Sequence, residues 1–186
     1  YTLVGIPKCD QHLIHVYPEP DEIGRVYKPQ LGIAAPPDEV IASLLRCAGP
    51  DTDLSNRQVA VAEFNADYRA WSTLPKGRGD LAMSEVMSQI EGALAKDAIV
   101  TNGAGNYTVW VHRFHRHRRY VTQLAPISGS MGYGLPAAVA AARVMPDRQV
   151  VCFAGDGCFL MHGQELATAA QHGAQPIVLI LNNGIY

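Results

Sequence analysis

Two short apolar runs near the end of the chain constrain its fold more than any other feature. They occupy residues 149–154 and 176–181, and each leads directly into a polar corner, Gly155-Asp156-Gly157 after the first and Asn182-Asn183 after the second. The stretch 158–172 between them has helical character and is long enough to connect two parallel strands. Because open parallel sheets bind ligands at the carboxyl ends of their strands, we expect the two corners to meet at one edge of a sheet.

The side chains of these corners suit a metal ion and phosphate. Asp156 offers hard anionic oxygens and Asn183 a neutral oxygen. Magnesium prefers few carboxylates, together with water and phosphate oxygens. Gly157 is expected to open a helix, whose free backbone N–H groups favour phosphate. The sequence therefore predicts a site for a diphosphate and Mg²⁺.

A third polar, glycine-rich corner at residues 102–107 follows an apolar run at residues 97–101. Helical patterns precede and follow it, at residues 83–96 and 134–144. Strands that alternate with helices predict an α/β fold, with a parallel sheet that carries helices on both faces. A third corner fits a ligand crevice formed by several strand ends.

Composition excludes several classes of function. The chain has 186 residues, of which 48% are hydrophobic and 17% charged, and its net charge is −2. This charge gives no reason to expect nucleic acid or an anionic membrane as a partner, and no apolar run approaches the ~20 residues of a membrane span. The four cysteines form no CxxC pair, which favours a reduced, cytoplasmic protein in which Cys152 is a small buried hydrophobe.

Apolar residues at helical spacing predict two packed helices. In the helix expected over residues 57–71, we expect a stripe of Val61, Phe64, Tyr68 and Trp71 to pack in the core. The second helix, expected over residues 83–96, carries an apolar stripe that we also interpret as core: Met83, Val86, Met87, Ile90 and Leu94.

The run HRFHRHRR at residues 112–119 has three interpretations. His112 and His115 lie one helical turn apart and could hold a metal, and the four arginines could form a nucleic-acid patch. The third interpretation is a solvated helix end whose basic residues favour the helix dipole, or contact another segment or subunit. We prefer the third, because no further metal ligand has a defined spacing and the net charge opposes nucleic-acid binding.

The spacing of the corners resembles that of a known family. A Gly-Asp-Gly followed by Asn-Asn, with 27 positions from Asp156 to Asn183, resembles the signature of thiamine diphosphate-dependent enzymes. The segment GSMGYGLPAA, which starts at Gly129, resembles the one that precedes this signature in the acetolactate synthase-like branch. The resemblance implies that Asp156, Asn183 and the backbone carbonyl of Ile185 hold Mg²⁺.

The resemblance implies further contacts with thiamine diphosphate. Gly157 and Cys158 would supply N–H groups to phosphate. Met131 would hold the cofactor bent, and the carbonyl of Gly129 would accept a hydrogen bond from the aminopyrimidine. We expect these two residues to carry the positioning part of catalysis. Four residues of the corner at residues 102–107 would contact the diphosphate: Ala104, Gly105, Asn106 and Tyr107.

The sequence departs from the family at three of these positions. Acetolactate synthases usually carry glutamine and histidine where Asn106 and Tyr107 stand, which weakens an assignment to true acetolactate synthase. The position of Cys158 is often serine or alanine, so a hydroxyl that faces phosphate would be lost. Asn106 can still donate to a phosphate oxygen.

The resemblance also predicts the domain organisation. Residues 1–49 resemble the end of the middle domain of acetolactate synthase-like enzymes, residues 50–57 would be a linker, and residues 58–186 a truncated thiamine diphosphate-binding domain. We therefore expect the chain to be a piece of a longer protein. An FAD site would belong to the middle domain, and the sequence assigns no residue to it.

The implied activity is that of a thiamine diphosphate-dependent lyase or transferase. The parent protein would decarboxylate or ligate a small 2-oxo acid as a homodimer or homotetramer. The glutamate that activates the cofactor would come from another domain, and Glu165 is interpreted as structural, so the chain alone is expected to be catalytically silent. Two alternatives stay open: a non-catalytic cofactor-binding or interaction module that retains the fold, and a nucleotide-binding α/β domain.

Overall fold

The structure is a computed structural model that describes residues 5–47, 49, 55–77 and 81–184. Two compact units divide the chain, the first over Tyr1–Gln58 and the second over Val59–Tyr186. Residues 50–54 of the expected linker lie outside the described residues, and residues 55–57 form the first turn of helix α2 (Ser55–Trp71). The assignment of residues 1–49 to a middle domain stays a prediction.

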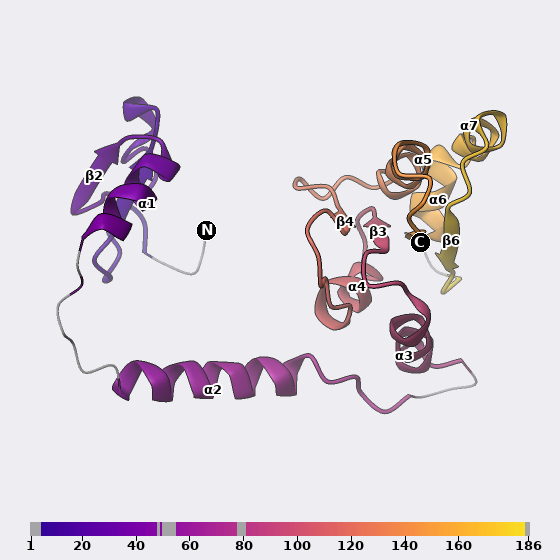
Figure 1. Cartoon of the computed structure of the whole chain (residues 1–186), viewed down its shortest axis with the longest axis horizontal. Coiled ribbons are helices and arrows are strands. Elements are labelled where there is room, and N and C mark those ends of the chain that lie inside the picture. Colours follow the sequence, from indigo (N-terminus) through magenta and orange to yellow (C-terminus); the bar gives the residue numbers. More distant parts are fainter. Residues whose placement is uncertain (1–4, 48, 50–54, 78–80, 185–186) are drawn as a thin grey trace. The chain divides into compact units, whose positions relative to one another are not determined.

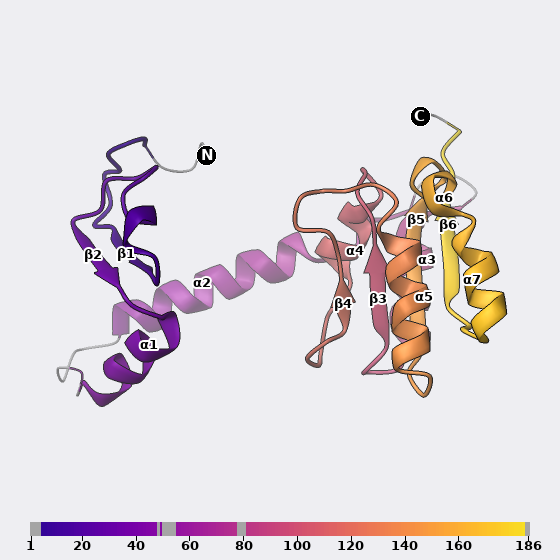
Figure 2. The same cartoon turned by 90° about the horizontal axis from the view of Figure 1, so that it is seen from above.

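The first unit is a small parallel α/β element. Strands β1 (Ile14–Tyr17) and β2 (Leu31–Ala34) pair in parallel, with Ile14 opposite Leu31 (Figure 2). A 3₁₀ turn, η1 (Pro20–Glu22), lies between them, and helix α1 (Pro37–Arg46) follows. Helix α1 (Figure 1) begins at Pro37, because proline's fixed φ suits the first position of a helix.

The second unit contains a four-stranded sheet in which every neighbouring pair is parallel. The strands are β3 (Ile99–Asn102), β4 (Gln123–Leu124), β5 (Val150–Gly155) and β6 (Ile177–Leu181). Their spatial order is β4-β3-β5-β6. The chain therefore moves outward from β3 to β4, and then returns to place β5 on the other side of β3. The carboxyl ends of β3 and β5 flank this reversal, which is where open α/β sheets bind ligands.

Helices cover both faces of this sheet, which confirms the predicted α/β class. Helices α5 (Gly134–Val144) and α7 (Glu165–His172) lie on one face, and α3 (Met83–Ala93) and α4 (Thr108–Phe114) on the other (Figure 2). Helix α6 (Asp156–His162) follows β5 directly. The crossover expected as one helix over residues 158–172 is thus two helices, separated at Gly163 and Gln164.

The buried strand β5 sorts its side chains between two cores. Its residues at 150, 152 and 154 pack with the small side chains of α5, and those at 151 and 153 pack with Met87 of α3 and Val111 of α4. This alternation is the period of two expected for a strand. The buried alanines of α5 bring the helix close to the sheet, and Cys152 is fully buried there, as predicted.

The methionine stripe of α3 packs as predicted. Met87 is fully buried, and Met83, Ile90 and Leu94 pack against the same core. The fifth residue of the stripe, Val86, faces a cavity instead.

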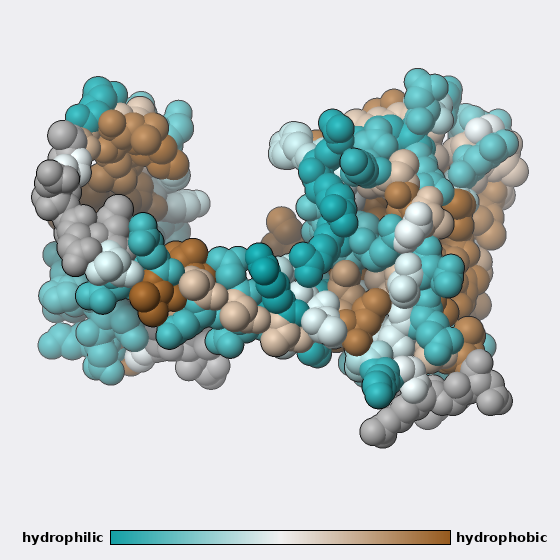
Figure 3. Space-filling view, turned by 60° about the horizontal axis from the view of Figure 1, so that its bottom comes forward, coloured by the Kyte–Doolittle hydropathy of each residue, from teal (hydrophilic) through white to brown (hydrophobic). Residues whose placement is uncertain are grey.

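The predicted core role of the aromatic stripe in α2 is wrong. No residue of α2 is buried, and the exposed fractions of Phe64 and Trp71 are 72% and 52%. Hydrophobic residues lie among hydrophilic ones along this helix in the space-filling view (Figure 3). Helical spacing indicates that an apolar face exists but not what covers it. The Tyr68 and Trp71 rings lie beside each other, and the guanidinium groups of Arg116 and Arg113 stack on them.

The basic run at residues 112–119 leaves the helix earlier than expected. Helix α4 ends at Phe114, and His115 is already extended. The backbone turns away because Glu91 of α3 binds both the His115 ring and the amide of Arg116. His112 points elsewhere, to Asn102. Within the described residues no group of three metal-ligating side chains occurs, so the metal interpretation gains no support there.

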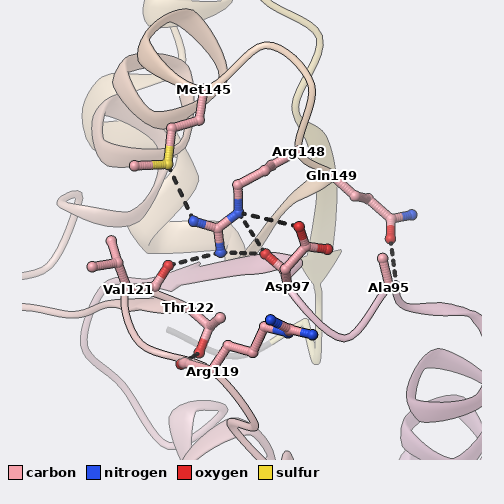
Figure 4. A network of polar contacts seen from close by, with 8 residues as sticks. All are labelled: Ala95, Asp97, Arg119, Val121, Thr122, Met145, Arg148 and Gln149. Carbon is pink, nitrogen blue, oxygen red and sulfur yellow. Dashed lines mark hydrogen bonds and ion pairs between the residues drawn. The ribbon is translucent and has the colours of Figure 1, made fainter.

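Arg148 ties together the segments that enter the sheet (Figure 4). Its Nε donates to the carbonyl oxygen of Asp97 at 2.7 Å, and its Nη2 donates to the carbonyl oxygen of Val121 at 2.8 Å. Its Nη1 lies 3.2 Å from the sulfur of Met145 at the end of α5. One side chain thus joins the approaches to β3 and β4 with the end of α5.

Replacing Arg148 with methionine is expected to lower the free energy of unfolding by about 2 kcal/mol, because the partly buried carbonyl of Asp97 and the more exposed carbonyl of Val121 both lose a charged donor. Urea unfolding followed by circular dichroism measures the change. Arg143→Met, at an exposed position of α5, is the matched control and should stay within about 0.5 kcal/mol of the wild type. Equal effects of the two substitutions would show that the network does not stabilise the fold.

Candidate functional site

A cavity of about 750 Å³ lies at the carboxyl ends of β3, β5 and β6. The first corner contributes residues 104–107, the second residues 155–158, and the third Asn182 and Asn183. These corners are far apart in sequence, and the parallel register of the three strands brings them to the same edge. The sheet thus assembles the polar residues that the strand-end pattern singled out.

Most of the predicted site residues line this one cavity: Ala104, Gly105, Asn106, Tyr107, Met131, Asp156, Gly157, Cys158 and Asn183. Gly129 does not line it, and adopts a left-handed conformation with φ 69°. Ile185 lies outside the described residues. The structure therefore brings nine of the predicted side chains or backbone positions together, and their roles stay predictions.

The corner after β5 is built by a strand that runs straight into a helix. Gly155 is the last residue of β5 and the N-cap of α6, and Asp156 is the first helical residue. The helix therefore begins one residue before the expected Gly157. The Asp156 side chain is half-buried at the mouth of the cavity, while Gly157 and Cys158 are buried beneath it.

Tyr107 and Cys158 join the first two corners. The Gly103 N–H donates to the Tyr107 hydroxyl at 3.0 Å, and the Cys158 thiol donates to the carbonyl of Ala104 at 2.8 Å. Burial, with a contribution from Cys158, raises the pKa of Tyr107, so its hydroxyl stays neutral at physiological pH. These two bonds fix the loop after β3 against the start of α6.

The glycines of the corners let the Tyr107 ring lie against the backbone. A Cβ on Gly155 would lie 3.1 Å from the ring, and a Cβ on Gly105 would lie 3.0 Å from it. Gly105 also has a φ of 149°, which side chains rarely adopt. A side chain at Gly105 or Gly155 would therefore crowd the ring from either side.

Replacing Tyr107 with phenylalanine is expected to lower the free energy of unfolding by about 1–2 kcal/mol, because the buried Gly103 N–H loses its acceptor. Urea unfolding checks this. Tyr120→Phe is the control, since Tyr120 is 95% exposed, and should have no measurable effect. A Tyr107→Phe variant as stable as the wild type would contradict a role for the hydroxyl in fixing this corner.

Met131 reaches the cavity from the loop before α5. It is 39% exposed and comes from a segment in which Gly132 has a φ of 82°. A Cβ on Gly132 would lie 2.4 Å from Nδ1 of His162 and 3.1 Å from Cβ of Met161. The loop is therefore seated against the end of α6, and this contact sets where Met131 enters the site.

The two asparagines of the third corner have different surroundings. The side-chain oxygen of Asn182 accepts a hydrogen bond from the Gly184 N–H at 2.8 Å, which forms a local turn. Gly184 has a φ of 67°, a left-handed conformation that glycine adopts readily. The turn holds the backbone of Asn183, whose side chain also lines the cavity.

Sequence reasoning missed the apolar wall of the cavity. It is formed by residues from α3, α4, β5 and β6: Met83, Val86, Trp110, Phe153, Leu179 and Leu181. Val86 and Met83 were visible as part of an apolar stripe, but a stripe does not reveal which members face a cavity. Asn182 was also missed as a lining residue, although it adjoins Asn183. Among the residues that the structure describes, the site thus has a polar edge with one carboxylate and a broad apolar wall.

None of the helices in the described part of the chain is long and apolar enough to cross a membrane.

Burial raises the pKa of Cys152, which keeps this thiol protonated and unreactive.

The chain is similar to known proteins along nearly its whole length. It is 30% identical over 174 residues to the acetolactate synthase isozyme 1 large subunit of Escherichia coli (strain K12), which covers 92% of this chain and 30% of that protein. It is 34% identical over 183 residues to the acetolactate synthase large subunit of Parasynechococcus marenigrum, which covers 92% of this chain and 28% of that protein. The chain spans about 30% of the length of these relatives.

A third relative is the acetolactate synthase large subunit of Corynebacterium glutamicum, 32% identical over 183 residues that cover 94% of this chain and 29% of that protein. Residues 103–186 match the family described as thiamine pyrophosphate enzyme, C-terminal TPP binding domain. This match includes all three polar corners and the loop that carries Met131. Residues 103–186 therefore belong to the C-terminal TPP-binding domains of the thiamine pyrophosphate enzymes, in a chain whose sequence is acetolactate synthase-like.

Proposed function

We propose that the second unit holds the diphosphate of thiamine diphosphate through Mg²⁺, as the diphosphate-binding part of a 2-oxo acid decarboxylase or carboligase. The observation that carries the proposal is the meeting of Asp156, Asn183 and Met131 in one cavity at the ends of three parallel strands. Partners of the parent protein would be a small 2-oxo acid and further copies of itself.

The residues of the cavity fit the cofactor and the ion. One carboxylate and one amide oxygen, beside a glycine-lined backbone, are the hard ligands that leave room for phosphate oxygens and water around Mg²⁺. The apolar wall suits the aromatic rings of thiamine. Asp156 is the one carboxylate among the described lining residues, which keeps the negative charge there low enough for an anionic diphosphate to approach.

The residues would divide the work of binding. Asp156 and Asn183 would hold Mg²⁺, and the backbone of residues 104–106 and 157–158 would face the phosphates. Met131 would support the rings from the loop before α5 and so orient them. When bound, thiamine diphosphate supplies the carbanion chemistry that 2-oxo acid decarboxylation needs. No residue of this chain is assigned to activate the cofactor, so we expect binding without turnover by the chain alone.

Calorimetric titration of the 186-residue chain with thiamine diphosphate tests the proposal. We expect binding in Mg²⁺ that is lost in EDTA, and ADP should bind at least tenfold more weakly in the same buffer. Equal binding of ADP would favour a nucleotide site instead. A folded chain that binds no thiamine diphosphate in Mg²⁺ would contradict the proposal for this chain.

A further inference from the structure

A second cavity, of about 260 Å³, lies at the opposite end of the sheet. Its walls come from the end of α3, from Lys96 and Ala98 just before β3, from the segment after α4, and from Thr122 just before β4. It therefore faces the amino ends of the strands, whereas the proposed cofactor site faces their carboxyl ends. The basic run that the cofactor site does not use forms one wall.

Positive charge exceeds negative charge around this cavity. Lys96, Arg116 and Arg118 line it, and Glu91 is the acidic residue among its lining residues. The Arg116 guanidinium donates to the Ser72 hydroxyl and stacks on Tyr68, so Lys96 and Arg118 carry the positive charge that a ligand would meet. The Glu91 carboxylate is already engaged by the His115 ring and the Arg116 N–H. The neighbouring Asp97 pairs with Arg148 instead, at 3.9 Å.

Two histidines stiffen the same wall. The His115 and His117 rings meet edge to face, with centroids 4.6 Å apart. Nδ1 of His117 lies 3.2 Å from the Thr122 hydroxyl, which itself donates to the carbonyl of Arg119. Burial and the neighbouring His115 lower the pKa of His117, so this ring adds no positive charge at neutral pH.

We propose that this cavity binds a small polyanion of the phosphate class. Lys96 and Arg118 line a space that a phosphate ester or pyrophosphate can enter, and guanidinium forks match phosphate oxygens. The volume of about 260 Å³ favours a small ligand over a nucleic-acid strand, which would need an extended track of charge.

Calorimetric titration of the full 186-residue chain with inorganic pyrophosphate, at pH 7 in low salt with EDTA, tests the proposal. Arg118→Ala and Lys96→Ala should each weaken binding about tenfold, the loss of one charge-assisted contact. Both positions are exposed, so the variants should fold. Arg143→Ala removes the same charge from the exposed surface of α5, outside the cavity, and should leave the affinity within twofold of the wild type.

The proposal would be overturned if the wild-type chain did not bind pyrophosphate, or if Arg118→Ala and Lys96→Ala did not weaken binding. It would also be overturned if Arg143→Ala weakened binding as much as they do. Unchanged binding by Arg118→Ala and Lys96→Ala would place pyrophosphate elsewhere on the chain, and weaker binding by Arg143→Ala would show a general effect of surface charge. A single-stranded oligonucleotide that binds more tightly than pyrophosphate, and loses affinity in all three variants alike, would also contradict a defined pocket.

Discussion

Replacing Phe153 with alanine is expected to lower the free energy of unfolding by about 3–5 kcal/mol. Phe153 is 1% exposed in the middle of β5 and packs with Met87, Val111 and Phe114. Alanine would leave a void between the sheet and helices α3 and α4, and would also open the apolar wall of the cofactor cavity. Urea unfolding followed by circular dichroism and tryptophan fluorescence measures the loss.

The matched control is Phe64→Ala in α2, where the side chain is largely exposed. This substitution removes the same atoms from the surface and should cost less than about 1 kcal/mol. If Phe64→Ala destabilised the chain as much as Phe153→Ala, the core would not lie between this sheet and its helices. It would also mean that α2 packs against something in solution.

Replacing Gly134 with alanine should lower the free energy of unfolding by about 2 kcal/mol, because there is no room for a methyl group at this position of α5. A Cβ there would lie 2.9 Å from the backbone nitrogen of Gly103 and 3.0 Å from the carbonyl carbon of Asn102. The carbonyl of Gly134 also accepts a hydrogen bond from Thr101 at 2.8 Å. A shift of α5 away from β3 would disturb the corner after β3, so the affinity for thiamine diphosphate should fall too.

Gly92→Ala is the control for this substitution. Gly92 lies near the end of α3, and a Cβ there meets nothing within 4 Å. Alanine should therefore stabilise the helix by about 0.5–1 kcal/mol. Opposite signs for the same substitution at two helical positions would support the close approach of α5 to β3, and a neutral Gly134→Ala would contradict it. Urea unfolding reports both.

The fold of the second unit was predictable where local signals agree with tertiary packing. The helix expected at residues 134–144 has those bounds, because small residues, a preceding glycine-rich turn and Pro146-Asp147 all delimit it. The strands β5 and β6 begin one residue later than expected. Strand β5 is buried on both faces, and such burial produces a continuous apolar run in sequence. Strand β6 has the same kind of run, although Ile177 and Ile180 are exposed.

The failures share a physical cause. Helical periodicity in α2 shows an apolar face but not its partner, and the described residues leave Phe64 exposed. The basic run looked helical to residue 119, but Glu91, 24 positions before His115, draws the backbone out of the helix. Contacts between segments distant in sequence decided both outcomes, and local patterns do not contain them.

The candidate site was likewise predictable only in part. Its polar residues were predictable because each corner directly follows a strand, and parallel strands bring their carboxyl ends together. The apolar wall was not, because Val86 and Trp110 look like ordinary core residues in sequence. The link between Tyr107, Gly103 and Cys158 was also hidden, since it depends on how two loops pack.

Magnesium-dependent binding of thiamine diphosphate by Asp156→Asn and Asp147→Asn, compared by calorimetry, tests the proposed site most directly. Asp156 lines the cavity, whereas Asp147 is exposed in the turn after α5 and carries the same charge. Asp156→Asn should weaken binding at least 100-fold, because Mg²⁺ loses its anionic ligand, and Asp147→Asn should bind like the wild type. Full affinity in a folded Asp156→Asn variant, or an equal loss in both, would contradict a metal–diphosphate site at this corner.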